Sequence, residues 1–136
     1  MSNPRWEWVP FEAVLAIHEA QISEHGGIGD IRDKGVIESA LAKPQNHQAY
    51  GSPDAAALAA SYAFRLTRNH GFLDGNKRSG FAVAATFLDM NGYAVTAADE
   101  AIVETIVAVA SGVMAEERLA TWFRSNIVMS DEFLPE

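Results

Sequence analysis

An alanine-rich segment with a strong helix start constrains this fold more than any other stretch of the chain. Ser52-Pro53-Asp54 offers a capping side chain, a proline for the first turn and an acid that faces the positive end of the helix dipole. Leu58, Tyr62 and Leu66 then follow at helical spacing. Because alanine favours helix and lets a neighbouring backbone come close, we predict a central helix that closes near Asn69.

A second central helix is predicted across a short turn. Asp74-Gly75-Asn76 is strong turn chemistry, and an apolar helical pattern follows it through Phe81, Ala84 and Leu88. Asn91-Gly92 supplies a left-handed cap at the end of this pattern. The two central helices should therefore meet at a loop that ends in a helix N-terminus, where free backbone N–H groups favour an anion.

Four further helices are expected around this pair. They run from Pro10 to a stop at Gly26-Gly27, from a cap at Asp33 to a stop at Pro44, from Thr96-Asp99 to a stop at Ser111-Gly112, and along Leu119, Trp122, Phe123 and Ile127. Valine and isoleucine make a strand the alternative in the third of these, but its length and acidic start favour a helix. Gln45 to Gly51 is polar and reads as an ordered loop or a small hairpin. The predicted fold is an all-α, compact bundle of about six helices.

Size and composition favour one domain over residues 1–136. With 136 residues and 49% hydrophobic content, the chain can bury about two-thirds of its unfolded surface. It has no cysteine, so it forms no disulfide and no thiolate metal site, which fits a reducing compartment. No window reaches the roughly 18 apolar residues of a membrane span. We expect a cytoplasmic protein with no membrane contact.

The chain is acidic overall but carries one basic spot. Its formal net charge of -8 argues against a nucleic-acid binder, because duplex recognition relies on clustered lysine and arginine that neutralise phosphates. Residues 64–80 nevertheless hold four of the ten basic residues and one acid, whereas residues 89–136 hold nine acids and two bases. Local charge fluctuation is the alternative explanation. Because the basic spot coincides with the loop between the central helices, we expect an anion to bind there.

Two side chains of this loop suit proton transfer and metal binding. Imidazole is the one group in the stretch from His70 to Gly80 that readily exchanges a proton near neutral pH, so His70 suits a general base acting on a hydroxyl. Capping of helix carbonyls is the alternative role for a histidine at this place. Asp74 offers the kind of oxygen that Mg²⁺ takes together with substrate phosphates, and an Asx turn is its alternative role.

The next four residues have the chemistry of a phosphate site. Gly75 lets an anion approach the backbone, and Asn76 can cap the helix or donate its amide to an oxyanion. Lys77 and Arg78 fall in the first turn of the following helix, where cations oppose the dipole unless an anion compensates. Each alone could be an ordinary surface cation. Together they are the strongest indication of function, with Arg78 suited to bidentate phosphate contact and Lys77 to a point charge.

Other common chemistries fit less well. The chain has no G-x-x-x-x-G-K-[ST] P-loop, no nucleophile elbow and no H-E-x-x-H zinc motif. His18, His25 and His47 lack the spacing of a zinc site. His18 belongs to the first helical pattern, and we expect it to be structural.

The stretch from His70 to Gly80 resembles the signature H-x-F-x-[DE]-G-N-[GK]-R of the Fic/Doc superfamily. Lys77, where most Fic members have glycine, makes it similar to the Doc, or death-on-curing, branch. Residues 31–35 (IRDKG), 38–45 (ESALAKPQ) and 87–93 (FLDMNGY) are also similar to stretches usual in Doc-like toxins. The resemblance covers nearly the whole chain.

This resemblance implies a Fic fold and a role for each residue of the loop. His70 would activate a target hydroxyl, Asp74 would hold Mg²⁺, and Gly75 with Asn76 would form the anion hole. Lys77 and Arg78 would hold the phosphates of ATP. The resemblance also implies that Gln45 to Gly51 is the flap that aligns a target chain.

Departures from the common Fic pattern bear on the reaction. Typical Fic enzymes continue G-R-x-x-R, whereas Phe81 stands at the last position here, so the second phosphate-gripping arginine is absent. That arginine and a small residue at position 77 belong to the geometry that transfers AMP, so their joint loss counts against AMP transfer. Doc-like relatives with this pattern are implied to transfer the γ-phosphate. Gly71 replaces a common proline and affects loop rigidity more than chemistry.

Three functions follow from these observations. The first is a toxin of a type II toxin-antitoxin system that uses ATP and Mg²⁺ to phosphorylate a protein, by resemblance a translation factor such as elongation factor Tu, with a separate Phd-like antitoxin as partner. The second is an AMP-transferase with the same site. The third is a degenerate member of the fold that only binds a nucleotide or a partner, against which the intact His70, Asp74 and Arg78 speak.

Overall fold

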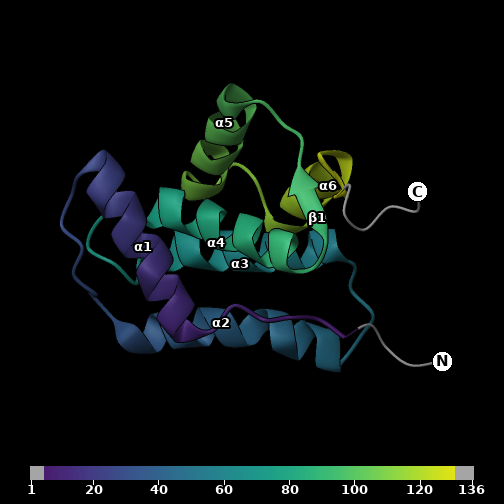
Figure 1. Cartoon of the computed structure of the whole chain (residues 1–136), viewed down its shortest axis with the longest axis horizontal. Coiled ribbons are helices and arrows are strands. Elements are labelled where there is room, and N and C mark those ends of the chain that lie inside the picture. The colour runs from purple at the N-terminus through teal and green to yellow at the C-terminus, as the bar shows by residue number, and fades with distance from the viewer. Residues whose placement is uncertain (1–4, 131–136) are drawn as a thin grey trace.

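The computed structural model describes residues 5–130, and this part of the chain is mostly helical (Figure 1). Its elements are α1 (Phe11–His25), α2 (Lys34–Ala49), α3 (Ala55–Asn69), α4 (Asn76–Met90), β1 (Tyr93–Val95), α5 (Asp99–Ala110), α6 (Glu116–Ser125) and β2 (Ile127–Met129). The prediction of an all-α bundle of about six helices is confirmed. Within residues 5–130, no helix is long and apolar enough to span a membrane.

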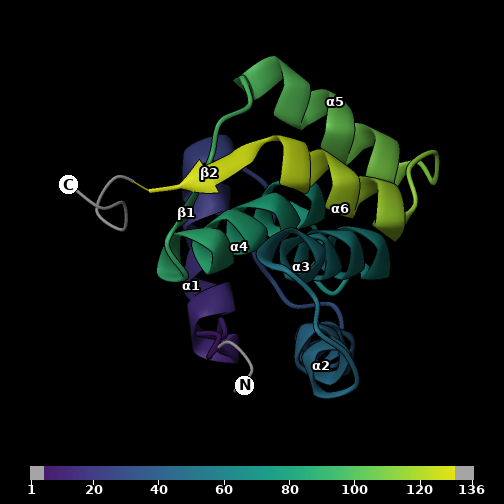
Figure 2. The ribbon, with the colours of Figure 1, turned by 90° about the vertical axis from the view of Figure 1, so that its right-hand side faces the viewer.

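Helix α3 lies at the centre of the molecule. Figure 2 shows α2 on one side of α3 and α4, α6 and α5 on the other, while α1 runs across the start of α4 in Figure 1. Asp54 caps α3 by accepting from the Ala57 N–H at 2.9 Å. Most of the side chains of α3 are buried: Ala55, Ala56, Leu58, Ala59, Ala60, Ser61, Tyr62, Ala63, Leu66 and Thr67. The predicted central position of the alanine-rich helix is therefore confirmed.

The two central helices approach each other closely through small residues. A Cβ added to Gly80 of α4 would lie 2.6 Å from Thr67 Oγ1 and 3.2 Å from the Ala63 carbonyl oxygen, both on α3. Such contacts are too short for any side chain, so glycine is needed where the helices meet. This close contact fixes where α4 begins relative to the end of α3, and the loop between them carries the candidate site.

The prediction that Pro44 ends the second helix is wrong. Helix α2 continues through Pro44 to Ala49, and the segment expected as a loop or hairpin at Gln45 to Gly51 forms mostly the last turn of this helix. An interior proline costs about 3 kcal/mol because it removes one backbone hydrogen bond. Here Pro44 is buried, and the packing of its ring offsets part of that cost.

A two-stranded antiparallel sheet was not expected from the sequence. Strand β1 pairs with β2 in the register Tyr93↔Met129, Ala94↔Val128 and Val95↔Ile127. Ile127 was predicted to continue the last helix, but α6 ends at Ser125. The pairing joins segments that are far apart in the sequence, and strands this short leave no clear local alternation.

Candidate functional site

His70 ends α3 in a left-handed backbone conformation. Its φ of 51° and ψ of 50° place it in the αL region, and it is the one residue other than glycine with positive φ among residues 5–130. For most side chains this conformation costs roughly 1–2 kcal/mol. The side chain of His70 is exposed, so the imidazole is available to solvent and to a ligand.

The strained backbone of His70 is held by the segment that precedes α2. Arg32 Nε donates to the His70 carbonyl oxygen at 2.6 Å, and Arg32 Nη2 donates to that of Asn69 at 3.4 Å. The backbone N–H groups of Arg32 and Asp33 both donate to the Gly71 carbonyl oxygen, at 2.8 and 3.0 Å. These bonds satisfy carbonyls that the end of α3 leaves free.

Gly71 is required at its position by packing. A Cβ added to Gly71 would lie 2.3 Å from Ile37 Cγ1, and Ile37 is itself buried in α2. No larger residue fits without moving the loop away from α2. The departure from the common proline at this position therefore follows from the close contact between loop and helix.

The side chain of Asn76 closes the turn. Its Oδ1 accepts from the Phe72 N–H at 3.1 Å, and its Nδ2 donates to the Phe72 carbonyl oxygen at 2.9 Å. Gly75, with φ of 79°, occupies the N-cap of α4, so the expectation that Asn76 caps this helix is wrong. Asn76 instead sets the shape of the turn that presents the helix N-terminus.

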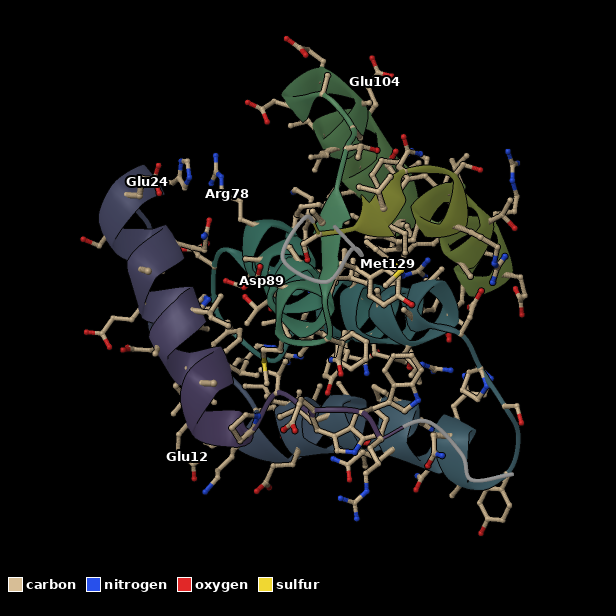
Figure 3. All side chains as sticks on the ribbon, turned by 45° about the vertical axis from the view of Figure 1, so that its right-hand side comes forward. Glu12, Glu24, Arg78, Asp89, Glu104 and Met129 are labelled. Carbon is tan, nitrogen blue, oxygen red and sulfur yellow. The ribbon has the colours of Figure 1, made fainter. Side chains whose placement is uncertain are left out.

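Two unpaired cations stand at the start of α4. The Ser79 N–H donates to the Gly75 carbonyl oxygen. The backbone N–H groups of the residues before Ser79 therefore have no acceptor within the helix. Lys77 and Arg78 are exposed, and neither forms an ion pair with the described part of the chain. Figure 3 shows Arg78 projecting into solvent on the side of the molecule where Glu24 of α1 also lies. A bound anion would be stabilised by the cations and by the helix dipole together.

Asp74 is exposed and shares one oxygen with the backbone. Its Oδ2 accepts from the Ile28 N–H at 2.8 Å, which orients the carboxylate and leaves Oδ1 without a described partner. No cluster of three or more His, Cys, Asp or Glu side chains suited to a metal occurs within residues 5–130. Mg²⁺ commonly takes one or two carboxylates and completes its shell with phosphate oxygens and water, so a single carboxylate beside an anion site fits this metal.

A groove adjoins the start of α4. It has a volume of about 650 Å³, and its walls come from the end of α1, from α4 and from α5. Gly75, Asn76, Lys77 and Arg78 line it together, and so does Phe81, which stacks on Phe123 at 6.1 Å between ring centroids. His70 and Asp74 do not line this groove. The structure therefore gathers the four expected phosphate-binding residues on one wall, with the candidate base and metal ligand elsewhere on the same loop.

The segment next to the loop is not the one expected. Ile31 forms an isolated antiparallel bridge with Phe72, and the Leu73 N–H donates to the Asp30 carbonyl oxygen at 3.0 Å. Residues 45–51 lie at and just beyond the end of α2, whereas the start of this helix contacts the loop. Because a helix rises about 1.5 Å per residue, the length of α2 separates residues 45–51 from the loop. The assignment of Gln45 to Gly51 as a flap beside the site is therefore wrong, and residues 26–33 occupy that place.

His18 packs from α1 against the loop and the start of α4, which agrees with the structural role expected from the sequence. It is 2% exposed, its Nδ1 is 2.7 Å from Ser79 Oγ, and its ring stacks on Phe72 with centroids 3.6 Å apart. Burial lowers the pKa of His18 below its ordinary value, so the neutral ring is favoured. The spacing from Val14 to His18 to Ile22 was the available signal, because it places His18 on the apolar face of its helix.

Comparison with known proteins identifies the family. The sequence profile of the Fic/DOC family matches residues 8–88, which include α1 to α3, the loop and most of α4. The chain is 32% identical over 114 residues to "Protein kinase doc" of Escherichia phage P1, across 83% of this chain and 90% of the relative. This chain belongs to the Fic/DOC family. A second Fic/DOC relative, "Toxin Doc" of Mycolicibacterium smegmatis, is 41% identical over 75 residues, 53% of this chain and 57% of that protein.

Family membership confirms the recognition made from the loop signature. The Fic/DOC match contains every candidate site residue from His70 to Arg78 and both segments that hold the loop, α1 and residues 26–33. Helices α5 and α6 lie outside it, although α5 forms one wall of the groove. The roles of the individual residues in this Fic/DOC protein remain predictions.

Proposed function

We propose that this chain is the toxin of a toxin-antitoxin pair and that it transfers the γ-phosphate of ATP to a hydroxyl of a target protein in the cytoplasm. The observation that carries the proposal is the pair of exposed cations, Lys77 and Arg78, in the first turn of α4 beside a groove, with no ion pair to either among residues 5–130. The relative named "Protein kinase doc" supports the reaction, and the relative named "Toxin Doc" supports the role. By resemblance, the target is a translation factor such as elongation factor Tu.

The proposed reaction assigns each residue one task. The target hydroxyl oxygen attacks the γ-phosphorus, the bond to the β–γ bridging oxygen breaks, ADP leaves, and His70 takes the hydroxyl proton. Lys77, Arg78 and the free N–H groups of α4 hold the phosphate oxygens. Asp74 would hold Mg²⁺ together with those oxygens, and the metal would neutralise negative charge on the transferring group.

Two residues favour phosphate over AMP transfer. Phe81 stands where the common Fic pattern has a second arginine, and its ring lines the groove and packs on Phe123. Lys77 stands where AMP-transferring relatives have a small residue. The α-phosphate of ATP therefore lacks one of its expected contacts, and AMP transfer is the second candidate function. A member of the fold that only binds is the third, and the exposed His70 on the same loop argues against it.

Separately labelled ATP distinguishes these candidates. The chain is incubated with a lysate and Mg²⁺, and with ATP carrying the label at either the α or the γ position. We expect label on a target protein from γ-labelled ATP alone, and a loss of about 10²- to 10⁴-fold in His70→Ala. Label from α-labelled ATP would replace the proposal with AMP transfer. If neither form of ATP labels a target protein while the chain still binds nucleotide, the binding function would replace the proposal.

The proposed partner is a separate antitoxin chain. The sequence has no evident inhibitory helix motif of its own, so inhibition in cis has no candidate segment. Co-expression with a Phd-like antitoxin should restore growth that this chain alone stops. Growth arrest that persists in His70→Ala would show that toxicity does not depend on phosphate transfer.

A further inference from the structure

We propose that His18 is a positioning residue for phosphate transfer, an inference that rests on the function proposed above. From α1 it holds the junction between the loop and α4, and so keeps the cations and the candidate base in a fixed position relative to each other. Figure 1 shows α1 running across the start of α4, where these contacts occur.

The imidazole of His18 touches the junction at three points. Its face stacks on Phe72, with an angle of 12° between the rings. Its Nδ1 and Ser79 Oγ form a hydrogen bond of 2.7 Å. Its Cε1 lies 3.2 Å from the position that a Cβ on Gly75 would take, so the ring also fills the space behind the anion-binding turn.

These three points connect to both halves of the site. Phe72 lies two residues after His70 and is bonded through its backbone to Asn76. Ser79 directly follows Arg78, and its N–H donates the first bond of the α4 ladder to Gly75. A shift of His18 would therefore move the base and the cations relative to each other.

Packing alone does not explain a histidine here. Nε2 of His18 is buried without a hydrogen-bond partner among the described residues, which costs free energy that a leucine would avoid. The hydrogen bond to Ser79 is what an apolar side chain cannot supply. That bond spans 61 residues of sequence and joins α1 to the first turn of α4.

The test compares His18→Leu, Ser79→Ala and the double variant, with Tyr62→Phe as matched control. Tyr62→Phe also removes a buried hydrogen bond, the one from the Val9 N–H at 3.1 Å, but two turns before the loop. We expect each single variant to lower kcat for γ-phosphate transfer about 10-fold per folded molecule, since a misplacement of about 1 Å can cost about 10²-fold. The double variant should lose little more than the worse single, because both remove one bond.

Amide hydrogen exchange provides a readout that does not need activity. We expect the Phe72 and Ser79 amides of His18→Leu to exchange about 10-fold faster than its global unfolding accounts for, and those of Tyr62→Phe not to. An unchanged kcat in an active His18→Leu, or exchange that follows global stability alone, would overturn the positioning role. An inactive wild-type chain would instead overturn the proposed function, and the exchange data would still decide whether His18 holds the junction.

Discussion

Arg32 Nε donates to the carbonyl oxygen of His70 at 2.6 Å, and so ties the candidate base to the segment that precedes α2. The bond acts on the backbone of a residue held in the left-handed region, where φ is 51°. It compensates part of the conformational cost and fixes the direction in which the imidazole leaves the chain. The position of the base therefore depends on a residue that touches neither the groove nor the cations.

Replacement of Arg32 should lower the rate of phosphate transfer without weakening nucleotide binding. We expect Arg32→Ala to reduce kcat about 10- to 100-fold with KM for ATP changed little, because His70 is released while Lys77 and Arg78 stay in place. Millimolar guanidinium should restore part of the rate. Arg118→Ala, an exposed arginine on α6, is the control. A wild-type kcat in Arg32→Ala would show that the loop holds His70 without this bond.

Asp74→Asn should shift the Mg²⁺ dependence rather than unfold the loop. Asparagine can still accept from the Ile28 N–H, so the loop keeps that contact, but one anionic ligand is lost. Activity should fall at low Mg²⁺ and recover partly as the concentration is raised. Asp89→Asn, at the other end of α4 (Figure 3), should leave the titration unchanged. Activity that persists in chelator would contradict a metal at Asp74.

The stability of the protein should fall below neutral pH because of His18. Burial holds the pKa of His18 below 6.5, so the unfolded chain takes up the proton first as the pH falls. The free energy of unfolding then decreases below about pH 6.5, by at most about 1.4 kcal/mol per pH unit for one proton. Urea unfolding of the wild type and of His18→Leu between pH 5 and pH 7.5 measures how the free energy of unfolding depends on pH.

The free energy of unfolding should change less steeply with pH in His18→Leu than in the wild type. Asp54 does not interfere, because the hydrogen bond from Arg124 lowers the pKa of its carboxyl below 3.8, and its contribution is lost only at lower pH. Equal slopes for wild type and variant would mean that the buried ring is not kept neutral.

Restoring the common Fic residues should change the product. Lys77→Gly with Phe81→Arg removes bulk from the turn and adds a second guanidinium to the groove wall, so the α-phosphate gains a contact. We expect the target to gain AMP in place of phosphate, read by mass spectrometry of the intact target. Phe81→Leu with wild-type Lys77 is the control and should keep phosphate transfer. An unchanged product in the double variant would mean that other residues orient the nucleotide.

The two central helices and the turn between them were predictable from the sequence. The start of α3 lies two residues later than expected, because Asp54 rather than Ser52 caps the helix through the Ala57 N–H. Gly75 takes a positive φ just before α4, and Lys77 and Arg78 fall in the first turn as expected. Each of these signals acts within a few residues, so local sequence contains all that is needed to recognise them.

Tertiary packing decided the rest. Pro44 stays inside α2 because its ring is buried, and Ile127 joins β2 because Val95 is available to pair with it. The bonds from Arg32 to His70 and between His18 and Ser79 span 38 and 61 residues. No local pattern contains such contacts, because they exist only after helices distant in sequence have packed together. The sequence by itself therefore determined which residues could do the chemistry, and the fold determined what holds them in place.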